Sequence, residues 1–328
     1  MRPEPVTLTD IEKAEDRIRN YLPPTPTEFS PPLSKALKKT TYLKLEVFQP
    51  IRVFKIRGAV NKVLSLSDSE LKRGVITASS GNHGLAVAHA SRKFGVRSVI
   101  CIPDKANPQK AGAIKAEGAE IVRAGANYDE TYEYAVKLAS KRNLTFVHAF
   151  DDKEVIAGQG TCGLEIAQQA RDLEAVVVSI GGGGLISGIA IALKGLLEKV
   201  SVYGVETRAV PSMYESVRRK RLTHVEGAPT IADGMTPSMP SERTFRIVSQ
   251  HVKRIALVDD AMLESAVLDL LLSARVLVEP AGAAPLAALK GTLRIQESRV
   301  VLVASGGNIA LSLLSRLMKS KRIVAGSS

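Results

Sequence analysis

Short apolar runs and helical patterns alternate strictly between residues 75 and 148, and this alternation limits the possible folds more than any other feature of the chain. A strand, a helix and a second strand form the repeating unit of a parallel sheet that carries helices on both faces. The expected strands are 75–78, 96–102, 120–123 and 145–148, and the expected helices are 85–94, 108–117 and 128–141. This segment therefore predicts an open α/β sheet of its own.

The rest of the chain has the same α/β character. Before the alternating segment we expect a helix at 9–21, a strand at 41–47 and a helix that begins inside 48–59 and ends near 66. After it we expect helices at 156–170, 185–196, 212–219, 261–273 and 284–290, and strands at 175–180, 200–205, 252–258 and 300–304. The Ser/Gly end of the chain is expected to be a short tail. These patterns predict a second α/β unit with a mostly parallel sheet.

The composition excludes several classes of protein. The 328 residues are 45% hydrophobic, which is enough for one large or two modest domains with buried cores. The net charge is +12, but the basic residues are scattered and aromatic residues make up only 4%, so nucleic-acid binding is not expected. Two cysteines exclude a disulfide framework. No signal region and no long apolar run are present, so we expect a cytoplasmic protein that does not span a membrane.

A glycine run separates the apolar segment 175–180 from the helical pattern after it. The run is Gly181-Gly182-Gly183-Gly184-Leu185. Without side chains at the turn, backbone N–H groups can close around a small anion at a helix N-terminus, which carries partial positive charge. The alternative is a tight turn, for which two glycines would suffice. The run is neither a G-x-G-x-x-G motif nor a P-loop. We therefore predict that it binds a phosphate.

Lys55 stands between two apolar residues, Phe54 and Ile56, near the expected start of a helix. An apolar niche lowers the pKa of a lysine because it disfavours the charged ammonium, and the neutral amine is a nucleophile. The alternative is an ordinary helix lysine whose aliphatic stem covers apolar surface while its ammonium stays in water. The local sequence alone favours this second interpretation.

Three further loops follow expected strands or open expected helices. They are Ser79-Ser80-Gly81-Asn82-His83-Gly84, Glu279-Pro280-Ala281-Gly282-Ala283 and Ser305-Gly306-Gly307-Asn308. With Phe54-Lys55-Ile56-Arg57-Gly58-Ala59 and the glycine run, in this order and spacing, they resemble the fold-type II pyridoxal-phosphate enzymes. Within that group the serine/threonine dehydratase and serine racemase family is the most similar, from about residue 21 to 317.

The resemblance implies an architecture similar to the β subunit of tryptophan synthase. Two open α/β domains with mostly parallel sheets are expected. The large domain would comprise residues 1–71 and 151–328, and the small domain residues 72–150. The active site would lie in the cleft between them.

The resemblance also implies roles around pyridoxal 5′-phosphate. Lys55 would bond to the cofactor aldehyde as a Schiff base and, once freed, take the proton from the substrate Cα. Glycines 181–184 with Leu185 would bind the phosphate, Asn82 the ring hydroxyl and Ser305 the pyridine nitrogen, with Phe54 beside the ring. The carboxylate of an amino-acid substrate would be held by Ser79, Ser80, Gly81, Asn82 and His83.

A serine at the ring nitrogen has a chemical consequence. A hydroxyl can only hydrogen-bond a neutral ring, which stabilises a carbanion less than a protonated ring does and favours prompt loss of a β-substituent. We therefore expect α,β-elimination from a β-hydroxy amino acid such as L-threonine or L-serine, giving a 2-oxo acid and ammonia. One alternative is an amino-acid racemase in which Lys55 and Ser80 are the two bases, because serine racemases of this family have a serine there. An alternative of another class is a non-catalytic phosphate- or nucleotide-binding module.

Two departures from the family pattern bear on function. Ile51-Arg52-Val53 stands where the family usually has Thr-Gly-Ser, which leaves the preferred β-hydroxy amino acid open. The family's divalent-cation site (Mg, Ca or Mn) uses a glutamate at the position of Glu206 and an aspartate six residues later, where this chain has Ser212. Glu206 with backbone carbonyls would hold a cation weakly, and its alternative role is pairing with a surface Arg or Lys. A homodimer is expected from the resemblance.

Overall fold

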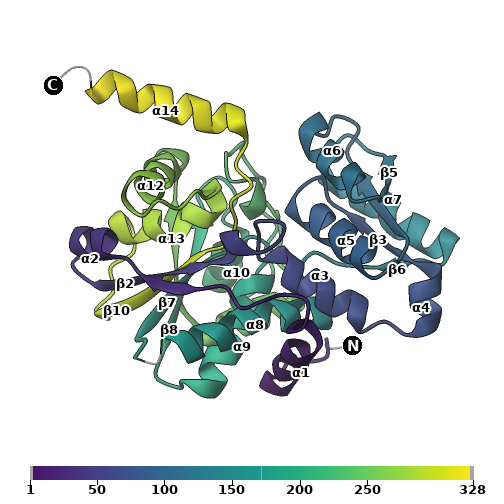
Figure 1. The fold of residues 1–328 in the computed structure, drawn as a ribbon, viewed down its shortest axis with the longest axis horizontal. Coiled ribbons are helices and arrows are strands. Elements are labelled where there is room, and N and C mark those ends of the chain that lie inside the picture. Colours follow the sequence, from purple (N-terminus) through teal and green to yellow (C-terminus); the bar gives the residue numbers. More distant parts are fainter. Residues whose placement is uncertain (1–2, 171, 326–328) are drawn as a thin grey trace.

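Two sheets, each flanked by helices, make up the protein (Figure 1). The computed structural model describes the backbone of residues 3–170 and 172–325. The tail expected at the end of the chain, residues 326–328, lies outside this described part. The larger sheet has six strands and the smaller one has four. The two α/β units with mostly parallel sheets that the sequence predicts are therefore present.

The six-stranded sheet has the order β1-β2-β10-β7-β8-β9. Its strands are β1 (Thr27–Phe29), β2 (Thr40–Leu45), β10 (Arg299–Ala304), β7 (Ala175–Ser179), β8 (Ser201–Thr207) and β9 (Val252–Val258). The edge strand β1 pairs antiparallel with β2, and the other neighbours are parallel. Parallel strands end at the same edge of the sheet, so the loops after β7, β8 and β10 meet there.

Helices cover both faces of this sheet, and the pattern of β7 shows why. Side chains alternate between the faces of a strand. Val177 packs in the cluster that contains α12 (Asp260–Ser273) and α13 (Pro280–Lys290). Val176 and Val178 pack in the cluster that contains α8 (Lys153–Gln169) and α9 (Gly184–Leu196). An apolar strand buried on both faces is typical of a parallel sheet. On the second face α11 (Glu242–His251) packs beside α9, and α1 (Leu8–Ile18) packs against α8.

The four-stranded sheet comes entirely from the segment where strands and helices alternate in the sequence. Its order is β5 (Glu120–Arg123), β4 (Ser98–Ile102), β3 (Val75–Ala78) and β6 (Thr145–Phe146), all parallel. Its helices are α5 (Asn82–Lys93), α6 (Pro108–Ala116) and α7 (Tyr128–Arg142). They follow the strands in turn, because parallel neighbouring strands need a crossover connection, which is usually a helix. Figure 1 shows this unit to the right of the six-stranded sheet.

Helix α3 (Lys55–Leu64) lies between the two units, because it packs against α8 on one side and α5 on the other. Beneath it four charged side chains form a buried cluster. The Arg57 guanidinium donates to Glu46 at 2.7 and 2.8 Å and to Glu165 at 2.6 and 2.7 Å. Lys44 Nζ also donates to Glu165, at 2.5 Å. The two positive and two negative charges compensate each other, as buried charges require.

Several element bounds differ from those expected. The strand expected at 41–47 ends at Leu45, because Glu46–Phe48 forms a 3₁₀ turn. The helices expected from residues 85 and 284 begin earlier, at Asn82 and Pro280. Both differences place polar loop residues at a helix start.

Among the α-helices and strands of the described residues, five have no counterpart among the sequence expectations. They are β1, α2 (Pro31–Leu37), α4 (Asp68–Arg73), α11 and α14 (Leu311–Ala325). Prolines 31 and 32 stand in the first turn of α2, where proline is tolerated because its missing N–H would have no partner within the helix. Helix α4 begins at a capping box formed by Ser67 and Glu70. Helix α14 projects from the body of the molecule (Figure 1).

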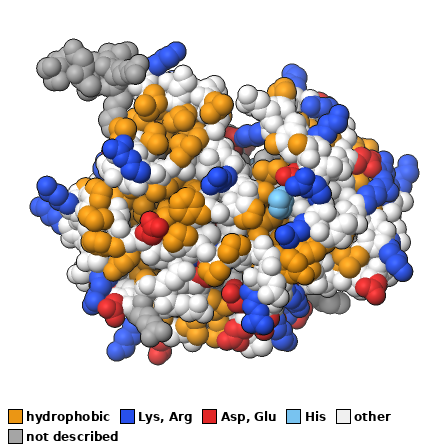
Figure 2. Space-filling model, in the orientation of Figure 1, with side chains coloured by type: hydrophobic (Ala, Val, Ile, Leu, Met, Phe, Trp, Pro, Cys, Tyr) orange, Lys and Arg blue, Asp and Glu red, His pale blue; other side chains and the backbone are white. Residues whose placement is uncertain are grey.

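The surface shows no single basic stripe on the face in Figure 2, where Lys and Arg side chains are dispersed over both units. This agrees with the scattered basic residues of the sequence. Within the described residues, none of the helices has the length and apolar character needed to cross a membrane.

Candidate active site

A pocket opens at the carboxyl ends of the parallel strands, where ligands bind in sheets of this kind. It is lined by Phe54, Lys55, Asn82, Phe150, Ser179, Gly181, Gly182, Gly183, Gly184, Leu185, Gly234, Glu279, Ala281 and Ser305. The nine residues expected to bind a cofactor are all among them. They come from stretches that lie far apart in the chain, so the fold brings the sequence motifs together in one place.

Lys55 begins helix α3 and its side chain points into this pocket. Its Nζ donates to the backbone carbonyl of Ala149 at 2.8 Å and lies 5.2 Å from the centre of the Phe54 ring. Burial lowers the pKa of Lys55 to about 8, although the nearby Glu279 carboxylate acts in the opposite direction. The lowered pKa is the effect expected of an apolar niche, and the interpretation as a solvated helix lysine, which the local sequence favoured, is wrong.

The glycine run forms a tight cradle at the start of α9. Gly183 has φ 89°, a left-handed conformation that favours glycine. A Cβ on Gly182 would lie 2.1 Å from the Phe150 ring, and one on Gly181 would lie 2.3 Å from the carbonyl oxygen of Gly234. The loop therefore has no room for side chains, and its N–H groups lie at a helix N-terminus, where an anion is stabilised.

Asn82 begins helix α5 and reaches across to the other unit. Its Nδ2 donates to both carboxylate oxygens of Glu279, at 2.8 and 3.0 Å. Its Oδ1 accepts a hydrogen bond from Asn308 Nδ2 at 2.9 Å. The sequence assigned no side-chain role to Glu279 or Asn308. Their positions in two motifs beside helix starts were the signal that could have found them.

Ser305 lies directly after β10, and only 2% of its surface is exposed. Its Oγ is 3.3 Å from Ser179 Oγ, and both residues line the pocket. The backbone of the loop after β10 also pairs with the segment before Lys55. Phe54 N donates to Ser305 O at 3.0 Å, and Gly307 N donates to Arg52 O at 2.8 Å. This pairing holds the lysine and Ser305 in a fixed relation.

The rest of the loop expected to hold a substrate carboxylate does not line the pocket. Ser79 Oγ accepts a hydrogen bond from the N–H of Gly81 at 3.2 Å. His83 is buried, with Nε2 at 3.1 Å from the carbonyl oxygen of Val147. Burial lowers the pKa of His83 to about 3, so the imidazole is neutral and brings no positive charge to a carboxylate. A carboxylate role for Ser79, Ser80, Gly81 and His83 stays a prediction.

Comparison with known proteins identifies the family of this chain. A family model described as pyridoxal-phosphate dependent enzyme matches residues 18–306. The chain is a pyridoxal-phosphate dependent enzyme. The L-threonine ammonia-lyase of Thermotoga maritima is 41% identical over 321 residues, which cover 98% of this chain and 80% of that protein.

Two solved structures share the fold of this pyridoxal-phosphate dependent enzyme. Maize serine racemase aligns over 99% of this chain and 100% of its own, with a TM-score of 0.92 and 30% identity. The processed form of threonine deaminase isoform 2 from Solanum lycopersicum aligns over 97% of this chain and 96% of its own, with a TM-score of 0.89 and 31% identity. The resemblance drawn from the sequence motifs is confirmed.

The pocket of this pyridoxal-phosphate dependent enzyme fits its cofactor. The cofactor carries an aldehyde, a phosphate, a ring hydroxyl and a ring nitrogen. The half-buried Lys55 amine suits the aldehyde, and the glycine run, whose neighbours leave no room for a Cβ at Gly181 or Gly182, suits the phosphate. Asn82 and Ser305 also line the pocket and carry hydrogen-bonding groups of the kind that the hydroxyl and the nitrogen require, and their roles stay a prediction.

Replacement of Gly182 by alanine is expected to weaken pyridoxal-phosphate binding by about 10-fold or more, since a loss of roughly 1.4 kcal/mol corresponds to that factor. The added methyl would collide with the Phe150 ring, so the loop must move away from the phosphate. Titration of the apoprotein, followed by absorbance, measures the affinity. Gly112→Ala is the matched control, because a Cβ there meets nothing within 4 Å. Equal affinity in both variants would refute the cradle.

The rate at which the apoprotein binds pyridoxal phosphate covalently is expected to rise with pH and level off above about 8. Only the neutral Lys55 amine reacts with an aldehyde, and the pKa of about 8 sets where it becomes neutral. A lysine with the ordinary value of 10.5 would keep gaining rate through pH 10. Stopped-flow absorbance measures the rate, with a free lysine derivative as the control. A wild-type rate that tracks the control contradicts the lowered pKa.

Glu206 lies at the end of β8 and is buried. Its two carboxyl oxygens accept the backbone N–H groups of Met213, at 2.9 Å, and Tyr214, at 2.7 Å, at the start of α10 (Ser212–Arg219). Burial raises the pKa of Glu206 to about 8. The carboxyl group therefore caps a helix, and the alternative of a pair with a surface Arg or Lys is wrong. Cation binding at Glu206 stays a prediction; in the described part of the chain no group of three or more His, Cys, Asp or Glu side chains is placed to hold a metal.

The unusual segment Ile51-Arg52-Val53 is absent from the pocket lining. Ile51 and Val53 are buried, and the Arg52 side chain points outward and is exposed. Arg52 has φ 61°, a conformation that favours the glycine usual in the family. The positively charged guanidinium of Arg52 therefore does not line the pocket.

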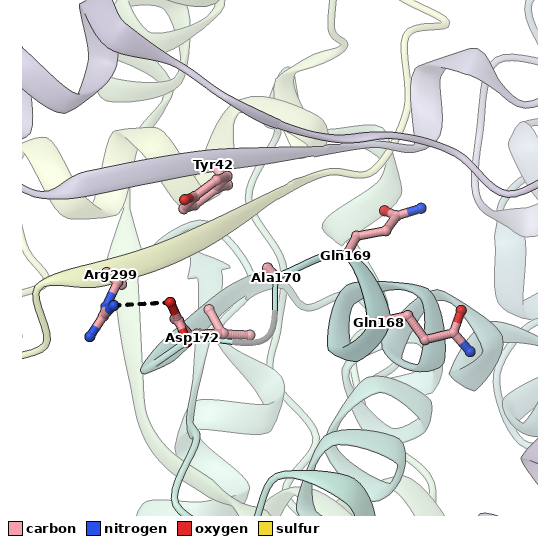
Figure 3. A pocket seen from close by; sticks show the side chains of 7 residues that line it. Tyr42, Gln168, Gln169, Ala170, Asp172 and Arg299 are labelled. Atoms are coloured by element: carbon pink, nitrogen blue, oxygen red, sulfur yellow. Dashed lines mark hydrogen bonds and ion pairs between the residues drawn. The ribbon is translucent and has the colours of Figure 1, made fainter.

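A wider cleft elsewhere carries none of this chemistry. It is lined by Tyr42, Gln168, Gln169, Ala170, Asp172, Leu173 and Arg299, and lies near the amino ends of β7 and β10 (Figure 3). Asp172 and Arg299 form an ion pair there at 3.3 Å. Ligands of parallel sheets bind at the opposite edge, where Lys55 lies.

Proposed function

We propose that this protein is a pyridoxal-phosphate-dependent ammonia-lyase that converts L-threonine or L-serine to a 2-oxo acid and ammonia. The observation that carries the proposal is the pocket that unites the half-buried Lys55 amine with the glycine cradle. Its support for this reaction comes from the 41% identity with an L-threonine ammonia-lyase over 98% of the chain. For L-threonine the products are 2-oxobutanoate and ammonia.

The roles proposed for the residues follow from their positions. When bound, the cofactor withdraws electrons from the substrate Cα and makes its proton removable. The neutral Lys55 amine takes that proton, and the ammonium so formed returns it to the hydroxyl on Cβ, which leaves as water. The released aminoacrylate then reacts with water to give the 2-oxo acid and ammonia. The N–H groups of glycines 181–184 hold the phosphate, and N–H groups at the start of α5 hold the substrate carboxylate. The Ser305 hydroxyl meets the ring nitrogen without charging it.

The decisive experiment incubates the cofactor-loaded protein with a panel of β-hydroxy amino acids, including L-threonine, L-serine and a hydroxyaspartate. Release of ammonia together with an equal amount of 2-oxo acid is expected. Borohydride reduction should abolish the visible absorbance band and leave the reduced cofactor covalently attached to Lys55, where it serves as a label. Absence of both the band and the 2-oxo acid would instead favour a non-catalytic phosphate-binding module.

A racemase is the second candidate, supported by the fold shared with maize serine racemase at a TM-score of 0.92. It would need Ser80 as the base opposite Lys55, and Ser80 does not line the pocket. Assay of the D-enantiomer beside the 2-oxo acid separates the two reactions. Loss of racemisation alone in Ser80→Ala would identify Ser80 as the second base, whereas equal loss of both reactions would count against it.

We further propose the division into a large domain of residues 1–71 and 151–328 and a small domain of residues 72–150, with the pocket in the cleft between them. Asn82 and Glu279, which meet across the pocket, would then belong to different domains. A homodimer is proposed as well, supported by exposed apolar side chains such as Phe29, Phe48 and Leu311, which are 51%, 53% and 71% exposed. Light scattering after gel filtration tests it. A cytoplasmic location stays a prediction.

A further inference from the structure

The carboxamide of Asn82 is held from two sides by residues to which no role has been assigned. Glu279 accepts from Asn82 Nδ2 through both carboxylate oxygens, at 2.8 and 3.0 Å. Asn308 Nδ2 donates to Asn82 Oδ1 at 2.9 Å and to the carbonyl oxygen of Ile51 at 3.0 Å. The hydrogen bonds thus run from Asn308 to Asn82 and from Asn82 to Glu279, with the NH₂ group of each asparagine as the donor.

This arrangement decides which way the carboxamide faces. Glu279 accepts from Asn82 through both oxygens; burial raises the pKa of Glu279, and the protonated acid would still keep its carbonyl oxygen as an acceptor for the NH₂ end. Asn308 keeps its own NH₂ on the Ile51 carbonyl and can offer only a donor to Asn82, which requires the oxygen end. A flipped Asn82 would place oxygen against oxygen on one side and NH₂ against NH₂ on the other. One N–H directed between the Glu279 oxygens satisfies both contacts and leaves the second N–H for the pocket.

The two partners are themselves rigidly placed. Glu279 precedes the first turn of α13, and its backbone N–H donates to Gly306 O at 2.9 Å. Its carboxylate packs over Gly306, where a Cβ would come within 2.7 Å of Glu279 Oε1. Asn308 lies two residues after Gly306, in the loop that begins with Ser305. The residues around the carboxamide therefore belong to the rigid part of the pocket that also holds the ring-nitrogen partner.

We infer that Glu279 and Asn308 are positioning residues that fix the Asn82 carboxamide with one N–H toward the pocket, so that Asn82 meets the cofactor's ring hydroxyl as a donor. The ionised ring hydroxyl only accepts hydrogen bonds, and a carbonyl oxygen in the same place would repel it. The inference rests on the role proposed for Asn82 and adds that Glu279 and Asn308 orient its carboxamide for that role. Glu279 also faces Lys55, so its charge and its acceptor function must be separated by experiment.

The test measures the dissociation constants of apoprotein variants for pyridoxal phosphate and for its 3-O-methyl analogue, which lacks the free ring hydroxyl. We expect Glu279→Ala and Asn308→Asp each to weaken pyridoxal-phosphate binding by about 10-fold, the loss typical of one hydrogen bond. Glu279→Gln keeps an acceptor but removes the charge, and its loss should stay below about 3-fold. With the methylated analogue, all variants should bind within about 2-fold of the unmodified protein.

Two comparisons make the result decisive. Asn82→Ala should itself lose affinity only for pyridoxal phosphate, and the double variant Glu279→Ala/Asn82→Ala should be no weaker than Asn82→Ala alone, because coupled residues are not additive. Asp260→Asn is the matched control: Asp260 also begins a helix and accepts from Thr230 and Ile231, outside the pocket. Its affinity should not change.

Each contrary result has a distinct meaning. Equal losses for cofactor and analogue, or additive losses in the double variant, would show that Glu279 only supports the pocket structure and would overturn the inference alone. An Asn82→Ala variant that binds both compounds normally would overturn the role proposed for Asn82 and the inference with it, while 2-oxo acid release still tests the proposed reaction. Asn308→Asp preserves side-chain size, so it carries the test if Glu279→Ala does not fold.

Discussion

Replacement of Lys55 by alanine is expected to lower kcat for 2-oxo acid formation by at least about 10⁴-fold, the upper range for loss of a positioned base, because a covalent anchor is lost as well. Lys55 Nζ is the amine that lines the pocket beside the glycine cradle. No other described lysine lines it. The substitution removes a buried amine without leaving a buried charge, so the fold should survive. Release of 2-oxo acid from saturating L-threonine measures the effect.

A lysine on the same helix provides the control. Lys62 lies in the last turn of α3 and pairs with Asp152 at 2.7 Å, away from the pocket. Lys62→Ala should keep kcat within about 2-fold, since substitutions away from a site have small effects. Borohydride should label the Lys62→Ala protein and leave Lys55→Ala unlabelled. Activity of Lys55→Ala above about 1% of the unmodified enzyme would show that another group removes the Cα proton.

Replacement of Arg57 by methionine is expected to reduce the free energy of unfolding by about 3–5 kcal/mol, the range for breaking a buried ion pair. The side chains of Arg57, Glu46 and Glu165 are at most 4% exposed. Burial, the largest single effect, would raise the pKa of Glu46, but the charge and hydrogen bonds of Arg57, with Lys44 and Thr25, together lower it, so the carboxylate is ionised. Methionine matches much of the arginine volume and leaves two carboxylates facing a single cation, Lys44.

Urea unfolding followed by circular dichroism measures this loss. Arg17→Met is the matched control, because Arg17 also pairs with a carboxylate, Glu154 at 2.7 Å, but both side chains are partly exposed at 34% and 26%. It should cost less than about 1 kcal/mol. Arg57 lies two residues after Lys55, so a destabilised Arg57→Met protein should also bind the cofactor less tightly. Equal stability of the two variants would show that water enters the cluster and screens it.

The sequence motifs predicted the residues that line the pocket more completely than the hydrophobic patterns predicted the buried charged residues beneath it. The strand, glycine run and helix around residues 175–196 are predictable locally, because the apolar periodicity and the glycines mark where each element begins and ends. The observed strand ends at Ser179 and the observed helix begins at Gly184, each one residue from the expected position. Local sequence favoured a solvated Lys55, however, because the depth of a niche depends on residues such as Ala149 and Glu279, which lie far along the chain. The outcome depended on combining several motifs rather than on any one.

The buried cluster was not predictable from local patterns. Lys44 alternates with Leu43 and Leu45, which predicts a solvent-facing side chain on a half-buried strand. Its complete burial arises because Glu165 on α8 and the edge segment near Thr25 cover that face. The role of Glu206 was not predictable for a similar reason. Its carboxyl group accepts a hydrogen bond from the backbone N–H of Met213, which lies seven residues further along the chain, in the first turn of a helix. Only the tertiary arrangement supplies such partners.

The backbone pairing between the segment before Lys55 and the loop after β10 has a consequence for motion. Lys55, Ser305 and the glycine run all attach to the six-stranded sheet, whereas Asn82 opens a helix of the other sheet. If the four-stranded unit swings outward, the residues proposed to hold the cofactor's aldehyde, ring nitrogen and phosphate keep their spacing. Asn82, proposed to contact the ring hydroxyl, and the rest of the loop at 79–83 would then move away from the cofactor together. The cofactor would then stay seated while the amino acid gains an exit, so product release and cofactor retention can proceed independently in the same pocket.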